Sequence, residues 1–156
     1  MISKLLGLLG TAPTRSFAIR RSLEGLFGGP ANRIGRLNVS IDFSVVIPTF
    51  RRPSELIEAI SSVLRQHDAT IEIFVIDDCP EGSAEEAVKG ISDSRLTYLK
   101  NPNPTGGVPS VVRNIGWPMA NGSFVHFLDD DDIVAEGHYA AVKAAFCPNR
   151  SQDILN

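Results

Sequence analysis

Four consecutive aspartates, residues 129–132, directly follow the apolar run 124–128. Such a run is typical of a buried strand in a parallel sheet, and the carboxyl ends of these strands form the ligand-binding edge of α/β proteins. Two carboxylates about 5 Å apart repel each other by roughly 3 kcal/mol at an effective dielectric constant near 20, so a cation would stabilise the cluster. An all-oxygen site suits Mg²⁺ or Mn²⁺, which commonly bind a phosphorylated substrate as well.

The acidic run also has other interpretations. Acidic runs are common in solvated loops and in the first turn of helices, where the helix dipole favours negative charge. An EF-hand loop that began at Asp129 would need glycine at its sixth position and glutamate at its twelfth, but Val134 and Ala140 stand there. The sequence therefore disfavours an EF-hand, and the solvated acidic loop remains the alternative to the metal site.

Composition and charge divide the chain into two parts. With 156 residues, 43% hydrophobic and 21% charged, the sequence has the composition of one globular domain, and its net charge of −3 does not favour a nucleic-acid-binding protein. Residues 1–39 carry six basic side chains and one acidic, a net charge of +5, whereas the remainder carries nine basic and seventeen acidic, a net charge of −8. We predict a basic, poorly ordered extension over 1–41 and a domain over 42–156.

The sequence of the extension and the two cysteines bear on the expected cellular location of the protein. Its apolar segment 5–9 is short for the core of a signal peptide and lacks a cleavage site, and no run reaches the eighteen apolar residues of a membrane span. Cys79 and Cys147 have no ligand spacing, which fits a reducing compartment. We expect a cytoplasmic protein, with residues 1–40 either an unordered tail or a peripheral contact with the inner face of the membrane.

From Asp42 onward, apolar runs of strand length alternate with segments of helical periodicity. The pattern predicts strands at 43–47, 71–76, 96–99 and 124–128, with helices at about 53–66, 83–89, 109–117 and 136–146. Ser83 and Glu86 have the spacing of a capping box, and Pro118 should end or kink the third helix. Strands separated by helices indicate an α/β fold with a mostly parallel sheet and helices on both faces.

Three of the predicted strands end in polar residues that should meet at one edge of the sheet. The distinctive residues at these strand ends are 48–52 (PTFRR) after the first strand, 77–78 (DD) after the second and 129–132 (DDDD) after the fourth. Neither a GxGxxG sequence nor a P-loop is present. Phosphate charge would therefore be met by the metal and by arginine rather than by a glycine-rich loop.

Four segments together resemble glycosyltransferase family 2, whose members have the Rossmann-like GT-A fold and depend on nucleotide sugars. They are VVIPTF at 45–50, VIDD at 75–78, VRNIG at 112–116 and FLDDDD at 127–132. The resemblance covers about residues 43–146, which would be the amino-terminal, nucleotide-binding half of that fold. Arg51 stands where the family often has asparagine, and residues 136–138 replace a stretch that commonly has proline and leucine.

The resemblance implies roles for individual residues. Those matching Pro48, Thr49 and Phe50 lie under the nucleotide base, where the Phe50 ring can stack on it. Either Asp78 or its neighbour Asp77 accepts an N–H from a uracil-type base. Arg113 is similar to the family's basic residue that faces the donor.

The aspartate run is similar to the family's DxD motif. Asp129 and Asp131 correspond to its outer members, with Asp131 the more direct metal ligand, and Asp130 lies nearer the ribose. Ordinary structural roles remain open for the other residues: Phe50 in the core, Asp77 and Asp78 as turn caps, and Arg113 in a surface ion pair.

The implied reaction is the inverting transfer of a sugar from a nucleotide diphosphate, UDP favoured, to a hydroxyl of a glycan, lipid or small molecule, assisted by Mn²⁺ or Mg²⁺. In the family the general base lies in the second half of the fold, so we expect it beyond Asn156. Without that half, the fourth strand should be an open edge of the sheet.

Two further hypotheses remain. The chain could be a catalytically silent nucleotide-binding remnant, or a partner-binding module without the acceptor half. A Mg²⁺-dependent phosphatase or receiver domain would also cluster acids, but it needs a partner lysine or threonine at a strand end, and we expect Lys89, Lys100 and Lys143 elsewhere. His126, inside a strand, is expected to be a core residue rather than a base.

Overall fold

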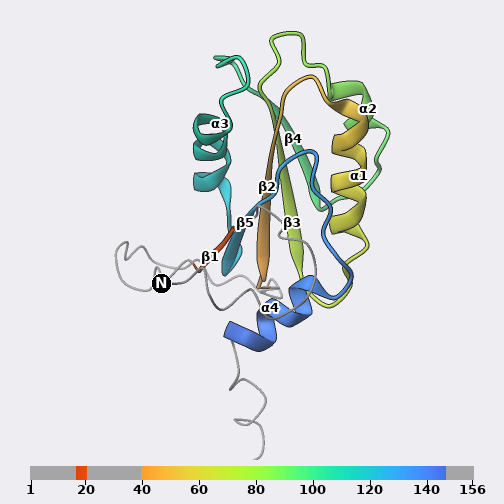
Figure 1. Cartoon of the computed structure of the whole chain (residues 1–156), viewed down its shortest axis with the longest axis vertical. Helices are drawn as coiled ribbons and strands as arrows, with labels where there is room; N and C mark the ends of the chain where they lie inside the picture. Colours follow the sequence, from red (N-terminus) through yellow and green to blue (C-terminus); the bar gives the residue numbers. More distant parts are fainter. Residues whose placement is uncertain (1–16, 21–39, 147–156) are drawn as a thin grey trace, which may run out of the picture.

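The computed structural model describes residues 17–20 and 40–146. The elements in chain order are β1 (Phe17–Arg20), β2 (Phe43–Thr49), α1 (Pro53–Leu64), β3 (Ile71–Asp77), α2 (Glu85–Lys89), β4 (Leu96–Lys100), α3 (Pro109–Gly116), the 3₁₀ helix η2 (Trp117–Met119), β5 (Phe124–Phe127) and α4 (His138–Phe146). The strands form one sheet in the order β1-β5-β2-β3-β4, in which β1 alone is antiparallel to its neighbour (Figure 1). The predicted mostly parallel α/β fold is confirmed.

Strands β2 and β3 form the buried centre of the sheet. All seven residues of β2 are buried, and in β3 only Glu72 is partly accessible. Helix α1 packs Leu56, Ile60 and Val63 against one face of the sheet, whereas α3 packs Val112 against the other. Because helices cover both faces, these strands are continuous apolar runs rather than alternating ones.

Helix α3 approaches β2 closely because residue 116 is glycine. A Cβ atom at Gly116 would lie 2.5 Å from Val46 Cγ1, which is far too close for two carbon atoms. The helix then continues as η2 through Trp117 and Pro118, so the predicted break at Pro118 is a change to 3₁₀ geometry. This close approach holds the last turn of α3 on β2, while Pro109, Val112 and Arg113 from the earlier part of the helix line the cavity described below.

The capping box predicted for α2 is wrong. Helix α2 begins at Glu85, its N-cap residue Ala84 makes no side-chain cap, and the buried Ser83 Oγ has no hydrogen-bond partner. The backbone N–H of Ala84 instead donates to Asp77 Oδ2 at 2.9 Å. A carboxylate at the end of β3 therefore replaces the local cap that the sequence suggested.

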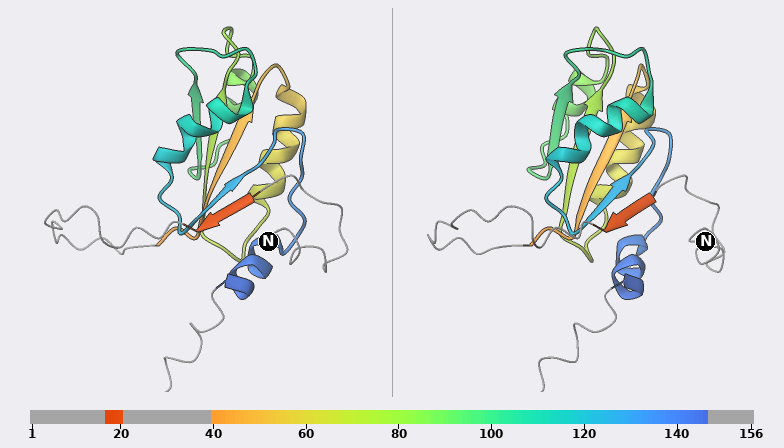
Figure 2. Two further views of the ribbon diagram at one scale, coloured as in Figure 1. Left: turned by 60° about the vertical axis from the view of Figure 1, so that its left-hand side comes forward. Right: turned by 90° about the vertical axis from the view of Figure 1, so that its left-hand side faces the viewer.

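The prediction that the fourth strand, β5, would be an open edge is also wrong. Strand β1 lies beside it, with Phe17 opposite Phe127 and Arg20 opposite Phe124 (Figure 2). The remainder of the predicted extension, and any membrane contact it makes, lies outside the described residues. Within residues 17–20 and 40–146, no helix has both the length and the apolar composition that crossing a membrane requires.

His126 in β5 is a buried residue, as expected. It is 2% exposed, its Nδ1 lies 2.8 Å from Tyr139 Oη, and its ring stacks on His138 with the centroids 5.6 Å apart. Burial, with a smaller contribution from His138, lowers the pKa of His126 from 6.5 to about 3. His138 is half-buried, and burial lowers its pKa too.

These histidines predict how stability depends on pH. A histidine whose pKa is lower in the folded state favours folding above its unfolded pKa of 6.5, and this contribution is lost as pH falls toward the folded value. We expect the free energy of unfolding, measured by urea titration, to fall by roughly 2 kcal/mol between pH 7.5 and pH 5. His126→Phe should flatten this dependence, whereas His67→Gln, at an exposed position, should leave it unchanged.

Candidate active site

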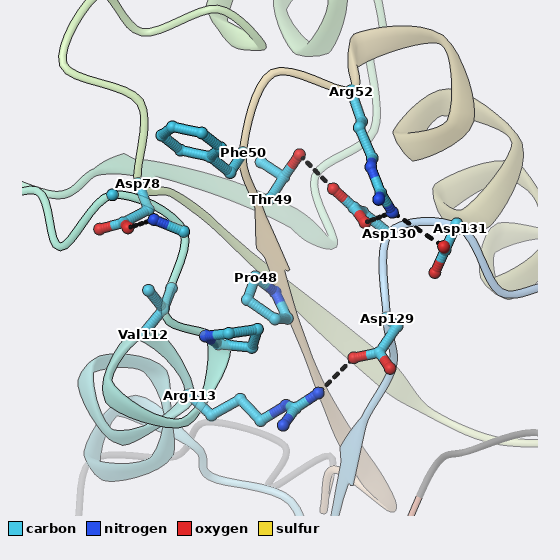
Figure 3. Close-up of a pocket in the computed structure, with 13 residues that line it drawn as sticks. Pro48, Thr49, Phe50, Arg52, Asp78, Val112, Arg113, Asp129, Asp130 and Asp131 are labelled. Carbon is cyan, nitrogen blue, oxygen red and sulfur yellow. Dashed lines mark hydrogen bonds and ion pairs between the residues drawn. The ribbon is translucent and has the colours of Figure 1, made fainter.

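The carboxyl ends of β2, β3 and β5 and the start of α3 surround a cavity of about 340 Å³ (Figure 3). This volume is in the range of sites for small molecules and cofactors. Eight of the nine site residues predicted from the sequence line the cavity: Pro48, Thr49, Phe50, Asp78, Arg113, Asp129, Asp130 and Asp131. The ninth, Asp77, is not among the lining residues.

Two arginines reach the aspartates that follow β5 (Figure 3). Arg113 from α3 forms an ion pair with Asp129, and its Nε is buried without a hydrogen-bond partner. Arg52, just before α1, lies 2.8 Å from Asp131 Oδ2 and 3.5 Å from Asp130 Oδ1. The repulsion expected within the acidic run is therefore offset by side chains of the protein itself.

Among the three aspartates after β5 that line the cavity, residues 129–131, Asp130 is the most buried. It is 8% exposed, and its Oδ2 accepts a hydrogen bond from Thr49 Oγ1 at 2.9 Å. Burial raises the pKa of Asp130 above its ordinary value, and the Thr49 hydroxyl and the Arg52 charge offset only part of that effect. Through this bond the end of β2 fixes the position of the loop after β5.

The donor set at this edge fits a metal ion whose coordination is completed by a substrate. Among residues 17–20 and 40–146, no three histidine, cysteine or acidic side chains are grouped to hold a metal ion. Mg²⁺ commonly binds through only one or two carboxylates, with phosphate oxygens and water completing its shell. Asp129 and Asp131 both line the cavity and supply such oxygens, so they could hold a metal together with a diphosphate.

Asp77 has a structural role at the end of β3. It is fully buried, and its carboxylate accepts hydrogen bonds from Cys79 N at 2.9 Å, Ala84 N at 2.9 Å and Tyr98 Oη at 2.9 Å. These donors come from the turn after β3, the start of α2 and strand β4. The turn-cap alternative therefore describes the contacts of Asp77.

Asp78 lines the cavity, and its carboxylate binds the loop 101–108. Asn101 Nδ2 and Thr105 N donate to its Oδ1, and Thr105 Oγ1 and Gly107 N donate to its Oδ2. Burial alone would raise the pKa of Asp78, but the hydrogen bonds from Thr105, Gly107 and Asn101 outweigh it and hold the pKa below its ordinary value. Asp78 is therefore ionised at neutral pH and acts only as an acceptor.

Phe50 forms one wall of the cavity. The Arg51 guanidinium lies over its ring, 5.1 Å from the centroid, and a Cβ atom at Gly107 would lie 3.1 Å from Phe50 Cδ1. Arg51 has a φ of 57°, which is unusual for a residue other than glycine, and its guanidinium also lies 3.4 Å from Glu81. Strained backbone of this kind is often found next to binding sites.

Sequence reasoning placed Arg52 at this edge of the sheet without a role of its own and did not assign Gly106 or Gly107, although all three line the cavity. Arg52 lies in the polar segment after the first strand, and its distance from the acidic run in sequence concealed the contact. Gly106 and Gly107 have φ values of 79° and 88°, which glycine adopts easily. The pair of adjacent glycines in the sequence was the signal that could have indicated this loop conformation. Lys100, expected away from the strand ends, in fact ends β4, but it is exposed and does not line the cavity.

Several known proteins are similar to this chain. A Campylobacter jejuni protein named GalNAc(5)-diNAcBac-PP-undecaprenol beta-1,3-glucosyltransferase is 38% identical over 96 residues, which are 60% of this chain and 31% of that protein. An Escherichia coli protein named UDP-Glc:alpha-D-GlcNAc-diphosphoundecaprenol beta-1,3-glucosyltransferase WfgD is 36% identical over 90 residues, 58% of this chain and 35% of that protein.

The fold is similar to that of a GT-A glycosyltransferase of known structure. The crystal structure of S. aureus TarS 1-349 in complex with UDP-GlcNAc superposes with a TM-score of 0.56 and 27% sequence identity, covering 67% of this chain and 30% of that one. The chain thus spans about a third of the length of the two relatives and of the TarS 1-349 fragment. Residues 44–154 match the family model described as Glycosyl transferase family 2, which is more than half of the sequence, so the chain belongs to that family.

Proposed function

We propose that this chain binds the donor in a glycosyltransferase that moves a sugar from a nucleotide-diphosphate sugar, UDP-type, to an acceptor hydroxyl. The observation that carries the proposal is one cavity that brings together an aromatic ring, an ionised acceptor, two arginines and three aspartates, contributed by β2, β3, α3 and β5. The names of the E. coli relative and of the TarS complex, which include UDP-Glc and UDP-GlcNAc, support a UDP-linked donor.

The nucleoside is proposed to lie against the β2 and β3 side of the cavity. The Phe50 ring would stack on the base, with Pro48 and Thr49 below it. Asp78 lines the cavity, whereas Asp77 is fully buried and is not a lining residue. Asp78 is therefore the better candidate for accepting the base N–H. Asp130 would accept a hydrogen bond from the ribose.

The diphosphate is proposed to lie between the aspartates and Arg113. The lining residues include four aspartates and two arginines, a formal net charge of −2, so a diphosphate entering alone would be repelled. Mn²⁺ or Mg²⁺ held by Asp129 and Asp131 would offset this repulsion and the charge that develops on the leaving diphosphate. Arg113 would then be released from Asp129 to face the phosphates.

We propose that the transfer inverts the configuration at the sugar carbon. A carboxylate would act as the general base that deprotonates the acceptor hydroxyl, and we assign this role to none of the described residues. The C. jejuni and E. coli relatives have undecaprenol-linked diphosphates in their names. A lipid-linked glycan is therefore the proposed acceptor, and residues 1–40 are proposed to contact the inner face of the membrane.

Titration calorimetry of UDP, GDP and their sugars, with and without Mn²⁺, tests the donor site. We expect UDP to bind more tightly than GDP and to require Mn²⁺ for most of its affinity. Equal, metal-independent binding of both nucleotides, or binding of neither, would contradict the proposal.

A second candidate is a nucleotide-binding module without turnover, since the chain spans about a third of its relatives. The two functions differ in the fate of the donor. Release of UDP from UDP-sugar, followed by coupled assay with an undecaprenyl-diphosphate-linked acceptor, supports the transferase. Donor binding without UDP release supports the module.

The proposed stacking on Phe50 gives a separate prediction. Phe50→Ala should weaken the binding of uridine by roughly 1–3 kcal/mol, the range measured for bases on aromatic side chains. Phe50→Tyr keeps the ring and should bind uridine as the wild type does, which controls for changes in the loop packed on it. If the alanine variant binds uridine normally, the base does not lie on this ring.

A further inference from the structure

The carboxylate of Asp78 is fully occupied by the loop 101–108. Its Oδ1 accepts from Asn101 Nδ2 at 2.7 Å and from Thr105 N at 2.9 Å, and its Oδ2 accepts from Thr105 Oγ1 at 2.7 Å and from Gly107 N at 2.7 Å. A carboxylate has about four lone-pair positions. A base N–H can therefore bind Asp78 only if one of these four donors leaves.

The four donors differ in how easily they can leave. Asn101 is 3% exposed, and its side chain also accepts from Asn103 N at 3.0 Å, so it is held on both sides. The backbone N–H groups of Thr105 and Gly107 can leave only if the loop moves, and Gly107 is packed on Phe50. The Thr105 hydroxyl can leave by rotation about one side-chain bond, after which the half-exposed side chain donates to water. This rotation also gives up the 3.2 Å bond that Thr105 Oγ1 accepts from Val108 N, but Val108 is 43% exposed and water can take the place of that acceptor.

We propose that Thr105 is a specificity-determining residue of the nucleotide site, whose hydroxyl occupies the position on Asp78 Oδ2 that a base N–H takes on binding. This inference rests on the proposed function and deepens it. In the absence of a base, the hydroxyl satisfies a buried carboxylate that would otherwise be costly. When a base enters, one donor replaces another on the same oxygen.

This exchange selects among bases. Uracil presents a ring N–H, so it can replace the hydroxyl and keep Asp78 satisfied. Cytosine presents a lone pair at the same ring position, which an ionised carboxylate repels, and its amino donor lies one ring position away. In the pose that fits uracil, Thr105 therefore stays in place and cytosine gains nothing from Asp78. A base therefore gains from Asp78 only if its N–H donates to the carboxylate more favourably than the Thr105 hydroxyl does.

Thr105→Val tests the exchange, because valine keeps the branched shape and the backbone N–H but removes the competing hydroxyl, and the exposed Val108 N that this hydroxyl accepts from can bind water instead. In the presence of Mn²⁺, we expect UDP to bind about 3- to 10-fold more tightly than to the wild type, the effect of one hydrogen bond, and CDP to bind unchanged. The readout is the ratio of UDP to CDP affinity by titration calorimetry. Thr105→Ser restores the hydroxyl and should restore the wild-type ratio.

Other results would overturn the inference. If Thr105→Val changes UDP and CDP affinity by the same factor, or weakens UDP, then Thr105 acts only on the shape of the loop. Thr105→Ala, expected to raise the ratio in the same way, is the substitute if the valine variant does not fold. If the wild type binds UDP and the Thr105 variants have the same ratio of UDP to CDP affinity, this inference alone is overturned. If the wild type binds neither nucleotide, the proposed function is overturned as well.

Discussion

Asp131→Asn is expected to weaken Mn²⁺-dependent binding of UDP by about 100-fold or more. A hard divalent ion is held mainly by charged oxygens, and asparagine keeps the size of the side chain while removing one charge from a site that has few protein ligands. The measurement is the affinity for UDP by calorimetry across a series of Mn²⁺ concentrations. The substitution should remove the metal dependence rather than the binding of uridine itself.

The control for Asp131→Asn is Glu136→Gln, which removes a charge from a nearby exposed acid that does not line the cavity. It should leave the metal dependence unchanged. Without metal, Asp131→Asn should bind UDP slightly better than the wild type, because the cavity loses a negative charge and Arg52 loses its partner at 2.8 Å. An unchanged metal dependence in Asp131→Asn would place the metal elsewhere.

The fold was largely predictable because the buried strands are continuous apolar runs. β2 and β3 are covered on both faces, so their composition alone distinguishes them from the amphipathic helix α1. The errors arose where a distant residue replaced a local signal. Ser83 has the sequence of a cap, but Asp77 satisfies the start of α2. Strand β1 was missed because four residues that pair with β5 have no periodicity of their own.

The residues of the candidate site could be predicted as a group, because parallel strands bring their carboxyl ends to one edge. Their partners could not. The ion pairs of Arg52 and Arg113 join residues far apart in the chain or on separate elements, and no spacing rule indicates them. The different surroundings of Asp77 and Asp78 were equally hidden. Consecutive side chains at a strand end point to opposite sides, so Asp77 binds the start of α2 and Tyr98 of β4, whereas Asp78 binds the loop 101–108 at the cavity.

This difference predicts that Asp77→Ala lowers the free energy of unfolding by about 3–5 kcal/mol. The substitution leaves two buried donors, Cys79 N and Ala84 N, and the partly buried Tyr98 Oη without an acceptor, and each buried unsatisfied group costs roughly 1–3 kcal/mol. Urea denaturation measures the loss. Tyr98→Phe removes only one of these bonds and should cost about 1 kcal/mol.

Asp68→Ala, at an exposed position, should have almost no effect on unfolding and serves as the control. Asp77→Asn separates the charge from the geometry, because its single carbonyl oxygen can still accept from some of the three donors. Its loss of unfolding free energy should therefore be smaller than that of Asp77→Ala. If Asp77→Ala unfolds with nearly wild-type stability but fails to bind UDP, then Asp77 is a nucleotide ligand after all. In that case the wall of the cavity must open far enough to expose a residue that the folded sheet, α2 and β4 now enclose.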